Sequence, residues 1–387
     1  MRRWSEKPFP GDVSLLVTID VECDKGAGWR PCWPLEYRSV TEGVGQRLRS
    51  VFLRHGVKPT YFLSPEVMRD PPCRDLLRSI SGEVELATHL HPEHSERQER
   101  PADVGPGAFQ CRLSPAEEGR QLESLTALFQ EAFGVAPRSF RAGRFGAGKS
   151  TLAHLERLGY DNDSSVTPHL RWGDDPDEMN FTASPEQPYL ADPGDLARPG
   201  AGPLLEFPVS ITGSRVGDLL RSRFLLEHGQ NLLKRAIRRG IRPSWLRPST
   251  DDVAGMVRVC DTLVDRHSSK GPVVLVMFLH AGEVVPGATP YSLAPGSADR
   301  ILQRIDDVLS ILRARGVRSL TMAEAGDHLR ATMRIPFTAR AGLVSMGPQA
   351  APNPGAPGRA CTTTQAFAST TTAPDATASS QTTSVTT

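Results

Sequence analysis

The sequence predicts an α/β protein, a distorted (β/α) barrel of about seven to eight parallel strands followed by a disordered C-terminal tail. Three observations lead to this prediction. Short apolar runs rich in β-branched residues alternate with longer segments of helical periodicity over some 320 residues. Acids, histidines and an arginine follow several of these runs, as reactive groups do at one end of a barrel. Beyond about residue 341 the chain consists mainly of Thr, Ser, Ala and Pro.

The expected elements alternate along the chain before that tail. Strands are expected at 13–19, 59–63, 84–88, 139–142, 160–164, 204–209, 273–279 and 317–320. Helices are expected at 42–55, 74–80, 114–134, 151–158, 216–239, 251–266 and 298–315, with a Pro-, Gly- and Asp-rich loop at 167–203. Strands separated by helices in this way favour a parallel sheet with crossover helices.

Local signals define the ends of two helices. The helix at 42–55 repeats apolar residues with helical period from Val44, and Gly56 is its expected stop. The stretch from Ser114 to Glu117 is a capping box that opens the next long helix, which Gly134 closes. Both segments are therefore predicted to be helices that follow a strand.

Composition indicates an ordinary globular protein. The chain has 387 residues, a formal net charge of +1, 23% charged and 39% hydrophobic residues. This charge gives no general bias toward nucleic acid, and no run approaches the ~20 apolar residues that a membrane span needs. The six cysteines form no CxxC pair and the N-terminus lacks the apolar core of a signal peptide, so we expect reduced thiols and a cytoplasmic protein. We expect one barrel domain over 1–340 and a low-complexity tail over 341–387.

Two clusters of metal-ligand residues follow the first and the third expected strand. Asp20 and Glu22 end the first apolar run, and their i, i+2 spacing puts both carboxylates on one face of a strand. His89, His91 and His94 follow the third run. Buried carboxylates are costly unless they are paired or bound to a metal. Together the two clusters supply oxygen and nitrogen ligands for a catalytic metal site.

Three further reactive residues are expected at the same end of the barrel. Arg141 follows the fourth strand, Asp163 lies in the fifth, and His280 follows the strand at 273–279. Residues that merely face solvent in turns would have no reason to share one end, so the coincidence favours a functional site.

A competing motif lies between the fourth strand and the next helix. Residues 143–150, GRFGAGKS, match the phosphate-binding pattern G-x-x-x-x-G-K-[ST], in which Lys149 would reach the phosphates. However, the preceding strand is short and carries two arginines, and the phosphate loop follows the acidic strand instead of preceding it. A P-loop NTPase would also leave the histidines without a role, so it remains an alternative.

Five motifs occur in the order in which the polysaccharide deacetylases have them. They are TIDVE at 18–22, ATHLHPEH at 87–94, FRAGRFG at 140–146, YDNDSS at 160–165 and VMFLHAGE at 276–283. Over about residues 13–325 the chain resembles this family, carbohydrate esterase family four with the NodB-homology domain, and in particular its WalW-like branch. The resemblance implies a distorted (β/α) barrel and metal-dependent removal of N- or O-acetyl groups from sugars.

The resemblance also implies a metal-ligand set. Glu22 would be the metal carboxylate, and His89 with either His91 or His94 would complete the set. In the family two adjacent aspartates are usual in the first motif, whereas this chain has D-x-E. The second motif is usually H-[ST]-x-x-H, but here Glu93 stands four residues after the first histidine. The second histidine ligand is therefore left open between the two positions.

The remaining motif residues receive catalytic roles through the same resemblance. Asp20 would be the general base, held by Arg141, and His280 would be the general acid, tuned by Asp163. Hydrolysis of an amide needs these types, because water must lose a proton and the leaving nitrogen must gain one.

We therefore expect a hydrolase acting on carbon–nitrogen bonds other than peptide bonds, with N-acetyl groups favoured over O-acetyl groups. Its expected partners are an acetylated sugar or polysaccharide precursor and a divalent metal, Zn²⁺ first and other divalent transition metals second, with no nucleic acid. A non-catalytic sugar- or metal-binding relative is the alternative from another class. The basic segment 214–242 is expected to be a solvated helix, with contact to a membrane or a lipid-linked glycan as its alternative. The oligomeric state is left open.

Overall fold

The computed structural model describes residues 7–95, 109–173, 179–213 and 243–333. Two predictions concern residues outside this part, namely the basic segment 214–242 and the tail 341–387. The domain boundary near residue 340 also lies outside it and stays a prediction. No helix within the described ranges combines the length and the apolarity that crossing a bilayer would require.

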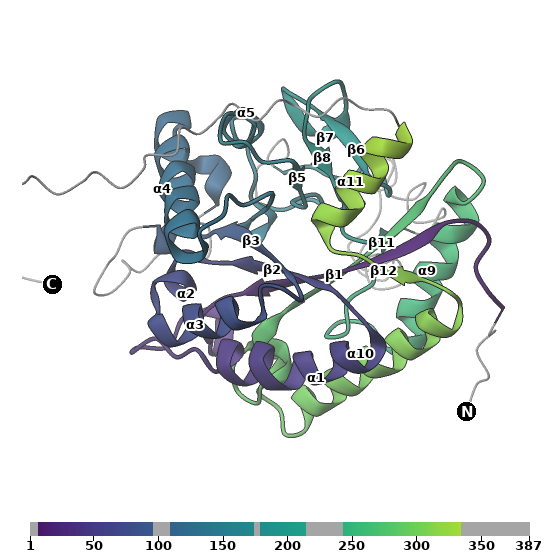
Figure 1. Cartoon of the computed structure of the whole chain (residues 1–387), viewed down its shortest axis with the longest axis horizontal. Coiled ribbons are helices and arrows are strands. Elements are labelled where there is room, and N and C mark those ends of the chain that lie inside the picture. Colours follow the sequence, from purple (N-terminus) through teal and green to yellow (C-terminus); the bar gives the residue numbers. More distant parts are fainter. Residues whose placement is uncertain (1–6, 96–108, 174–178, 214–242, 334–387) are drawn as a thin grey trace, which may run out of the picture. The chain divides into compact units, whose positions relative to one another are not determined.

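A curled and mostly parallel sheet forms the centre of the fold (Figure 1). Its strands follow the order β11-β1-β2-β3-β4-β5-β8-β6-β7, and β12 pairs with β1. The strands are β1 (Val13–Val21), β2 (Pro59–Leu63), β3 (Glu85–Leu90), β4 (Ser139–Ala142), β5 (Asn162–Asp163), β6 (Tyr189–Asp192), β7 (Asp195–Pro199), β8 (Leu205–Glu206), β11 (Val273–His280) and β12 (Arg318–Ser319). From β11 to β8 neighbouring strands are parallel, whereas β6 pairs antiparallel with β7 and β8. The predicted distorted (β/α) barrel is confirmed.

Helices connect the parallel strands, as crossover topology requires. They are α1 (Arg49–His55), α2 (Pro65–Arg69), α3 (Pro71–Ile80), α4 (Pro115–Phe133), α5 (Thr151–Arg157), α9 (Val253–His267), α10 (Ser297–Ala314) and α11 (Met322–Met333). The π-helix η2 (Ser39–Leu48) leads into α1, and short turns of helix include η1 (Ala27–Trp29), η3 (Pro92–His94), η5 (Gly143–Phe145) and η6 (Ala281–Val284), with η4 (Gln110–Arg112) and η7 (Pro290–Ser292) in two further loops. A second small sheet pairs β9 (Ile211–Thr212) with β10 (Ser244–Trp245).

The two faces of β1 have different surroundings, and this difference creates the site. Alternate residues such as Val17 and Ile19 belong to the large core between the sheet and its helices. Leu16, on the other face, belongs to a smaller core that α11 closes with Met322 and Leu329. Farther along that inner face come Thr18, Asp20 and Glu22, all of them buried. The period of two thus carries both acids into the interior of the curled sheet.

Strand register brings the other reactive residues to the same level. Asp20 lies opposite His280 in the pairing of β1 with β11. His89 lies opposite Arg141 in the pairing of β3 with β4. The expectation that these side chains share one end of the sheet therefore holds for four residues on four different strands.

The structure differs from the sequence-based elements in several places, and the expected strands 204–209 and 317–320 shorten to the two residues each of β8 and β12. The segment 167–203 was expected to be a loop, but it contains the β6–β7 hairpin, whose strands are hidden among turn-forming residues. Helix α11 continues the chain after the last expected strand. The expected strand 160–164 shortens to the two residues of β5. Ser114 caps α4, since its side chain accepts from the Glu117 N–H, but the Glu117 side chain contacts Arg120 and Gln121 and the second hydrogen bond of the expected capping box is not among the contacts of α4; Gly134 closes α4 with a φ of 73°.

Candidate metal and acid–base site

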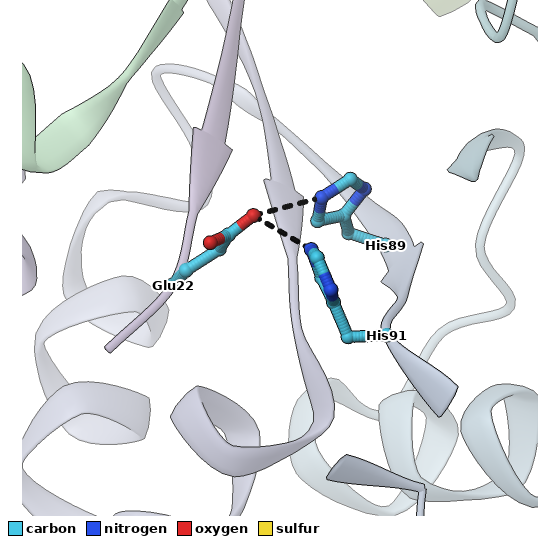
Figure 2. A group of neighbouring side chains, drawn as sticks. All are labelled: Glu22, His89 and His91. Atoms are coloured by element: carbon cyan, nitrogen blue, oxygen red, sulfur yellow. Dashed lines mark hydrogen bonds and ion pairs between the residues drawn. The ribbon is translucent and has the colours of Figure 1, made fainter. Parts of the chain in front are cut away.

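Two histidines converge on one carboxylate oxygen. The Nε2 atoms of His89 and His91 lie 3.1 Å and 2.8 Å from Oε1 of Glu22 (Figure 2). The two rings stand edge to face, with centroids 4.8 Å apart. Glu22 reaches this position from the end of β1, and His89 reaches it from β3 with His91 directly after the strand. The i, i+2 spacing of the histidines puts both on the inner face.

The third histidine points elsewhere. Pro92 ends the extended backbone, and η3 turns the chain before His94. The His94 ring lies with Cys23 and Glu66 as a separate group of possible metal ligands. Of the two positions that the sequence left open, the structure therefore groups His91 with Glu22 and His89.

Each of the two converging histidines has an acceptor behind it. Nδ1 of His89 lies 2.8 Å from the carbonyl oxygen of Arg141. Nδ1 of His91 lies 3.3 Å from Oε1 of Glu93 and 3.2 Å from Nη1 of Arg144, which also pairs with that carboxylate. Such partners fix the ring orientation of metal-binding histidines and leave Nε2 as the ligand atom.

This arrangement fits a divalent metal ion. When Nδ1 carries the proton, Nε2 presents a lone pair. A metal ion placed between two such lone pairs and the carboxylate oxygen of Glu22 would give all three ligand atoms a partner. Glu22, His89 and His91 offer ligand atoms within 4.8 Å of one another, and two imidazoles with one carboxylate form a set that zinc and related ions use.

A second grouping in the same space joins Asp20, Glu22 and His280. Burial raises the pKa of Asp20, but the charges of His89 and Arg141 outweigh it, so the pKa lies below its usual range. Nη1 of Arg141 donates to Oδ1 of Asp20 over 2.8 Å, and both side chains are buried. Because this ion pair keeps the carboxylate charged, Asp20 can accept either a proton or a metal ion.

Arg141 is held on all sides. Its Nε donates to the Ser164 carbonyl over 2.8 Å, and Nη2 donates to the hydroxyls of Thr18 and Ser164 over 2.9 Å and 2.8 Å. The guanidinium also lies over the Phe62 ring, 4.3 Å from its centre. These contacts leave the side chain one orientation, which points at Asp20.

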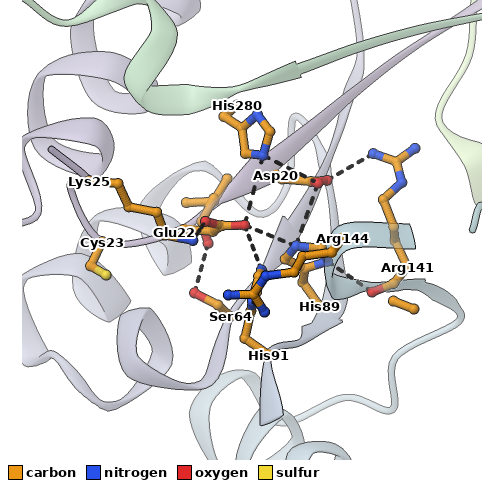
Figure 3. A network of polar contacts seen from close by, with 12 residues as sticks. Asp20, Glu22, Cys23, Lys25, Ser64, His89, His91, Arg141, Arg144 and His280 are labelled. Atoms are coloured by element: carbon orange, nitrogen blue, oxygen red, sulfur yellow. Dashed lines mark hydrogen bonds and ion pairs between the residues drawn. The ribbon is translucent and has the colours of Figure 1, made fainter. Parts of the chain in front are cut away.

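His280 faces the two acids from the opposite side (Figure 3). Its Nε2 lies 4.0 Å from Oδ2 of Asp20 and 3.9 Å from Oε1 of Glu22. Its Nδ1 lies 3.1 Å from Oε1 of Glu283, a buried carboxylate that Arg247 also holds. Burial raises the pKa of Glu283, but Arg247 and His280 outweigh it and lower the pKa to about 2. Glu283 therefore stays charged and orients the His280 ring.

Three residues of this site had no assigned role in the sequence analysis. Glu283 lies within the VMFLHAGE motif, so its position was available but its partner was not. Arg247 is remote from the motifs and reaches the site only through the fold. Lys25 contacts the other carboxylate oxygen of Glu22 with its buried ammonium group (Figure 3). Burial raises the pKa of Glu22, but Lys25 and His91 bring it well below its usual range.

Asp163 lies outside this circle of contacts. Its carboxylate accepts from the Ser165 hydroxyl over 2.8 Å and shares a hydrogen bond with Glu206. Within the described part of the chain, the acid that contacts Nδ1 of His280 is Glu283. The tuning of His280 by Asp163 stays a prediction, and the contacts offer Glu283 for this role instead.

The segment 143–150 is closed by its own contacts. The N–H of Gly146 donates to the Gly143 carbonyl over 2.9 Å, and the N–H of Gly148 donates to the Thr151 hydroxyl over 2.8 Å. A Cβ at Gly143 would lie 2.5 Å from the Leu90 carbonyl oxygen. In a phosphate loop these N–H groups point at the ligand. The internal hydrogen bonds therefore weigh against the P-loop alternative.

A small cavity opens beside the two acids. Its lining includes Asp20, Glu22, Lys25, Trp29 and His280. The indole of Trp29 packs on the His280 ring with centroids 4.7 Å apart. Carboxylate, imidazole and indole side chains therefore border the same cavity.

No family model and no curated protein matches the sequence. Three solved structures show what the chain is similar to. A candidate glycoside hydrolase/deacetylase from Parabacteroides distasonis has a TM-score of 0.56 at 13% identity, over 84% of this chain and 72% of that one. The PuuE allantoinase has a TM-score of 0.50 at 14% identity, over 85% and 95%. A candidate polysaccharide deacetylase from Mycobacterium smegmatis has a TM-score of 0.46 at 17% identity, over 87% and 96%.

Two of these likenesses, with TM-scores of 0.56 and 0.50, show the fold of the chain. Because the first of them is described as a candidate glycoside hydrolase/deacetylase, the predicted resemblance to polysaccharide deacetylases is confirmed at the level of the fold. Assignment to the WalW-like branch stays a prediction.

Proposed function

We propose that the protein is a metal-dependent deacetylase that hydrolyses the acetyl amide of an acetylated sugar or polysaccharide precursor. The observation that carries this proposal is the convergence of His89 and His91 on Glu22, with the Asp20–Arg141 pair beside them and His280 facing both acids. Metal ligands, an ionised carboxylate and a second proton carrier around one small cavity are the groups that amide hydrolysis needs.

In this proposal Glu22, His89 and His91 hold the metal, with Zn²⁺ as the expected ion. Bound there, a divalent metal lowers the pKa of a water molecule and polarises the acetyl carbonyl. The backing of His89 by a carbonyl and of His91 by Glu93 keeps both Nε2 atoms directed at the ion position.

Asp20 accepts the proton of the attacking water. Arg141 keeps its carboxylate ionised and immobile, so that the oxygen not bound by Arg141 remains available. His280 lies on the other side and donates a proton to the leaving nitrogen, which would otherwise depart as a poor anion. Arg247 and Glu283 orient His280 through contacts with its Nδ1.

The substrate is proposed to lie in the cavity beside Trp29. An indole face is an apolar surface against which a sugar ring can pack. The preference for N-acetyl over O-acetyl groups rests on His280, because an amine leaving group needs protonation more than an alcohol does. A cytoplasmic location and a barrel domain over residues 1–340 complete the proposal.

A non-catalytic sugar- or metal-binding relative is the second candidate. Lys25 is the observation that favours it, since its buried ammonium group contacts the carboxylate that would bind the metal. Two cations at one carboxylate repel each other, so Lys25 would have to yield as the ion binds. If the Lys25 ammonium group stays on Glu22, the metal cannot bind there and the protein would not catalyse hydrolysis.

Acetate release measured together with metal content separates the two candidates. The full chain is freed of metal, reloaded with zinc or with other divalent ions, and incubated with a panel of N- and O-acetylated glycans. The deacetylase proposal expects acetate release that disappears in the metal-free protein and returns with one bound ion. Protein that binds an acetylated glycan but releases no acetate from any member of the panel, whether or not it takes up zinc, would establish the second candidate.

A further inference from the structure

A second group of ligand-type side chains lies next to the proposed catalytic centre. Cys23, Glu66 and His94 each offer one ligand atom, and these atoms lie within 4.8 Å of one another. The three side chains are buried, with exposures of 3%, 6% and 4%. They come from the end of β1, from the first turn of α2 and from η3.

Two polar atoms of this group have no hydrogen-bond partner within the described part of the chain. They are Nε2 of His94 and Oε2 of Glu66. An unpaired buried polar atom destabilises the folded state, and an unpaired carboxylate oxygen does so more strongly. A metal ion bound between the two atoms would give each of them a partner and so remove this destabilisation.

The surroundings hold the group in place. Oε1 of Glu66 accepts from the Ser64 hydroxyl over 2.6 Å and from the Cys23 N–H over 3.2 Å, which leaves Oε2 free for a ligand. The carbonyl of His94 accepts from Arg69 over 2.6 Å, so the backbone that carries the ring is also fixed. A preorganised site loses little conformational entropy when it binds an ion.

This group shares no ligand with the catalytic centre. Glu22 and Cys23 are consecutive residues of extended chain, so their side chains point to opposite sides. On the other segment, His91 and His94 are separated by the turn at Pro92, and their ring centroids lie 6.3 Å apart. The extended backbone of one segment and the turn of the other therefore divide the ligands into two sets.

We propose that Cys23, Glu66 and His94 form a second metal site that binds a divalent transition metal ion of the zinc type. A thiolate, an imidazole and a carboxylate are the ligand types that such ions use, and the thiolate excludes the hard ions Mg²⁺ and Ca²⁺ as preferred occupants. The thiol proton leaves to solvent as the sulfur–metal bond forms. Three protein ligands leave one tetrahedral position for a water molecule. The ion ties the end of β1 to α2 and to the turn that follows His91.

The inference does not depend on the proposed deacetylase activity, because none of its three ligands belongs to the catalytic set. The test uses the full chain, freed of metal and titrated with Co²⁺, whose bond to a thiolate gives an intense charge-transfer absorption in the near ultraviolet. Bound metal is counted by elemental analysis after zinc loading. Both readouts are independent of enzyme activity.

The variants are Cys23→Ser and His94→Gln, with Cys260→Ser as the matched control. Cys260 is also a buried, unpaired cysteine, but it lies in α9. We expect the wild type and the Cys260→Ser variant to show the thiolate band and two zinc ions per chain. Each of the other two variants should lose one zinc ion, and Cys23→Ser should also lose the band.

Two outcomes would overturn the inference. One is a wild-type protein without a thiolate–cobalt band, and the other is a Cys23→Ser variant that binds as much zinc as the wild type. The His89→Ala variant distinguishes this result from failure of the catalytic centre, because it should keep the thiolate band while losing a zinc ion. If His89→Ala loses nothing but Cys23→Ser loses one ion, the second site stands and the proposed catalytic centre fails. Unfolding curves of His94→Gln and Cys23→Ser verify that each loss comes from a folded chain.

Discussion

Two pairs of buried acids in this fold have pKa values that are shifted in opposite directions. Asp20 lies on β1 and Glu22 directly follows that strand, whereas Asp163 and Glu206 lie opposite each other on β5 and β8. All four side chains are at most 5% exposed. The pKa of each acid on β1 lies below its usual range, and the pKa of each acid in the other pair lies above it.

The difference comes from neighbouring cations and not from burial. Burial raises the pKa in both pairs, but at β1 it is outweighed by Arg141, Lys25 and the histidines. At β5 and β8 the two acids mainly face each other, so one proton is held between Asp163 and Glu206. A pair held ionised can bind a metal and accept protons, whereas a pair that shares a proton joins two strands.

The largest predicted effect removes the metal from the ionised pair. Glu22→Ala and His89→Ala each delete one of three proposed ligands, so zinc binding at this position should be abolished or severely weakened and acetate release should fall to background. Elemental analysis of dialysed protein measures the metal. His328→Ala, a histidine 40% exposed at its side chain, serves as the control and should change neither quantity. Zinc at the wild-type stoichiometry in both variants would refute the ligand assignment.

The second prediction tests the proton donor opposite that pair. His280→Ala should retain the metal and lose ~10²–10⁴-fold in turnover of an acetylated amino sugar, the usual contribution of acid–base catalysis. The defect should shrink for aryl acetates, because their leaving groups need no protonation. Turnover of both substrate classes is measured on one preparation. An equal defect for both classes would remove His280 from the role of general acid.

The third prediction removes the cation that keeps Asp20 ionised. Arg141→Met leaves a buried carboxylate without its partner, which typically costs about 3–5 kcal/mol of folding stability. The pKa of Asp20 should rise, so the acidic limb of the pH–rate profile should move to higher pH. Urea unfolding and the pH profile measure the two effects. Arg49→Met, which breaks an exposed pair with Glu83, should leave both the stability and the pH profile almost unchanged, because surface ion pairs contribute little.

The smallest predicted effect concerns the pair that shares a proton. Because the pKa of Glu206 is raised by burial and by Asp163, the folded state binds more protons than the unfolded state above the usual carboxyl pKa of about 4.3. The wild type should therefore lose stability as the pH rises through the folded pKa. The side-chain amide in Glu206→Gln does not ionise, so this variant does not have to give up a proton at high pH. Its stability relative to wild type should therefore increase toward alkaline pH, by on the order of 1–2 kcal/mol. Parallel stability curves of the two proteins in urea would contradict the shared proton.

The sequence predicted the structure best where a local pattern, such as strand alternation or helix capping, determines the conformation without long-range contacts. The alternation of β1 placed both acids on the inner face, and Ser114 as N-cap set the start of α4. It left His91 and His94 unresolved because the outcome depends on the turn after Pro92, which ends the alternation between them. The β6–β7 hairpin was missed because its strands are short and stand among turn-forming residues.

Long-range partners were beyond the reach of sequence patterns. The contact of Arg247 with Glu283 joins segments 36 residues apart, and no motif links them. Glu283 was visible as part of a motif, but its partner His280 could not be read from spacing alone. The expectation that Asp163 acts on His280 came from the resemblance, whereas the fold pairs Asp163 with Glu206. Pairing between strands, which decides such contacts, is set by the whole chain.

The most direct test of the ionised pair is the metal content and turnover of Asp20→Asn, measured on the same sample. Asparagine keeps the shape of the side chain but cannot accept a proton from water. The account predicts one zinc ion at the Glu22, His89 and His91 position, as in the wild type, with turnover lowered ~10²–10⁴-fold for amide and aryl ester substrates alike. Loss of that zinc ion in Asp20→Asn would contradict the account, because Asp20 would then be a ligand and not the base.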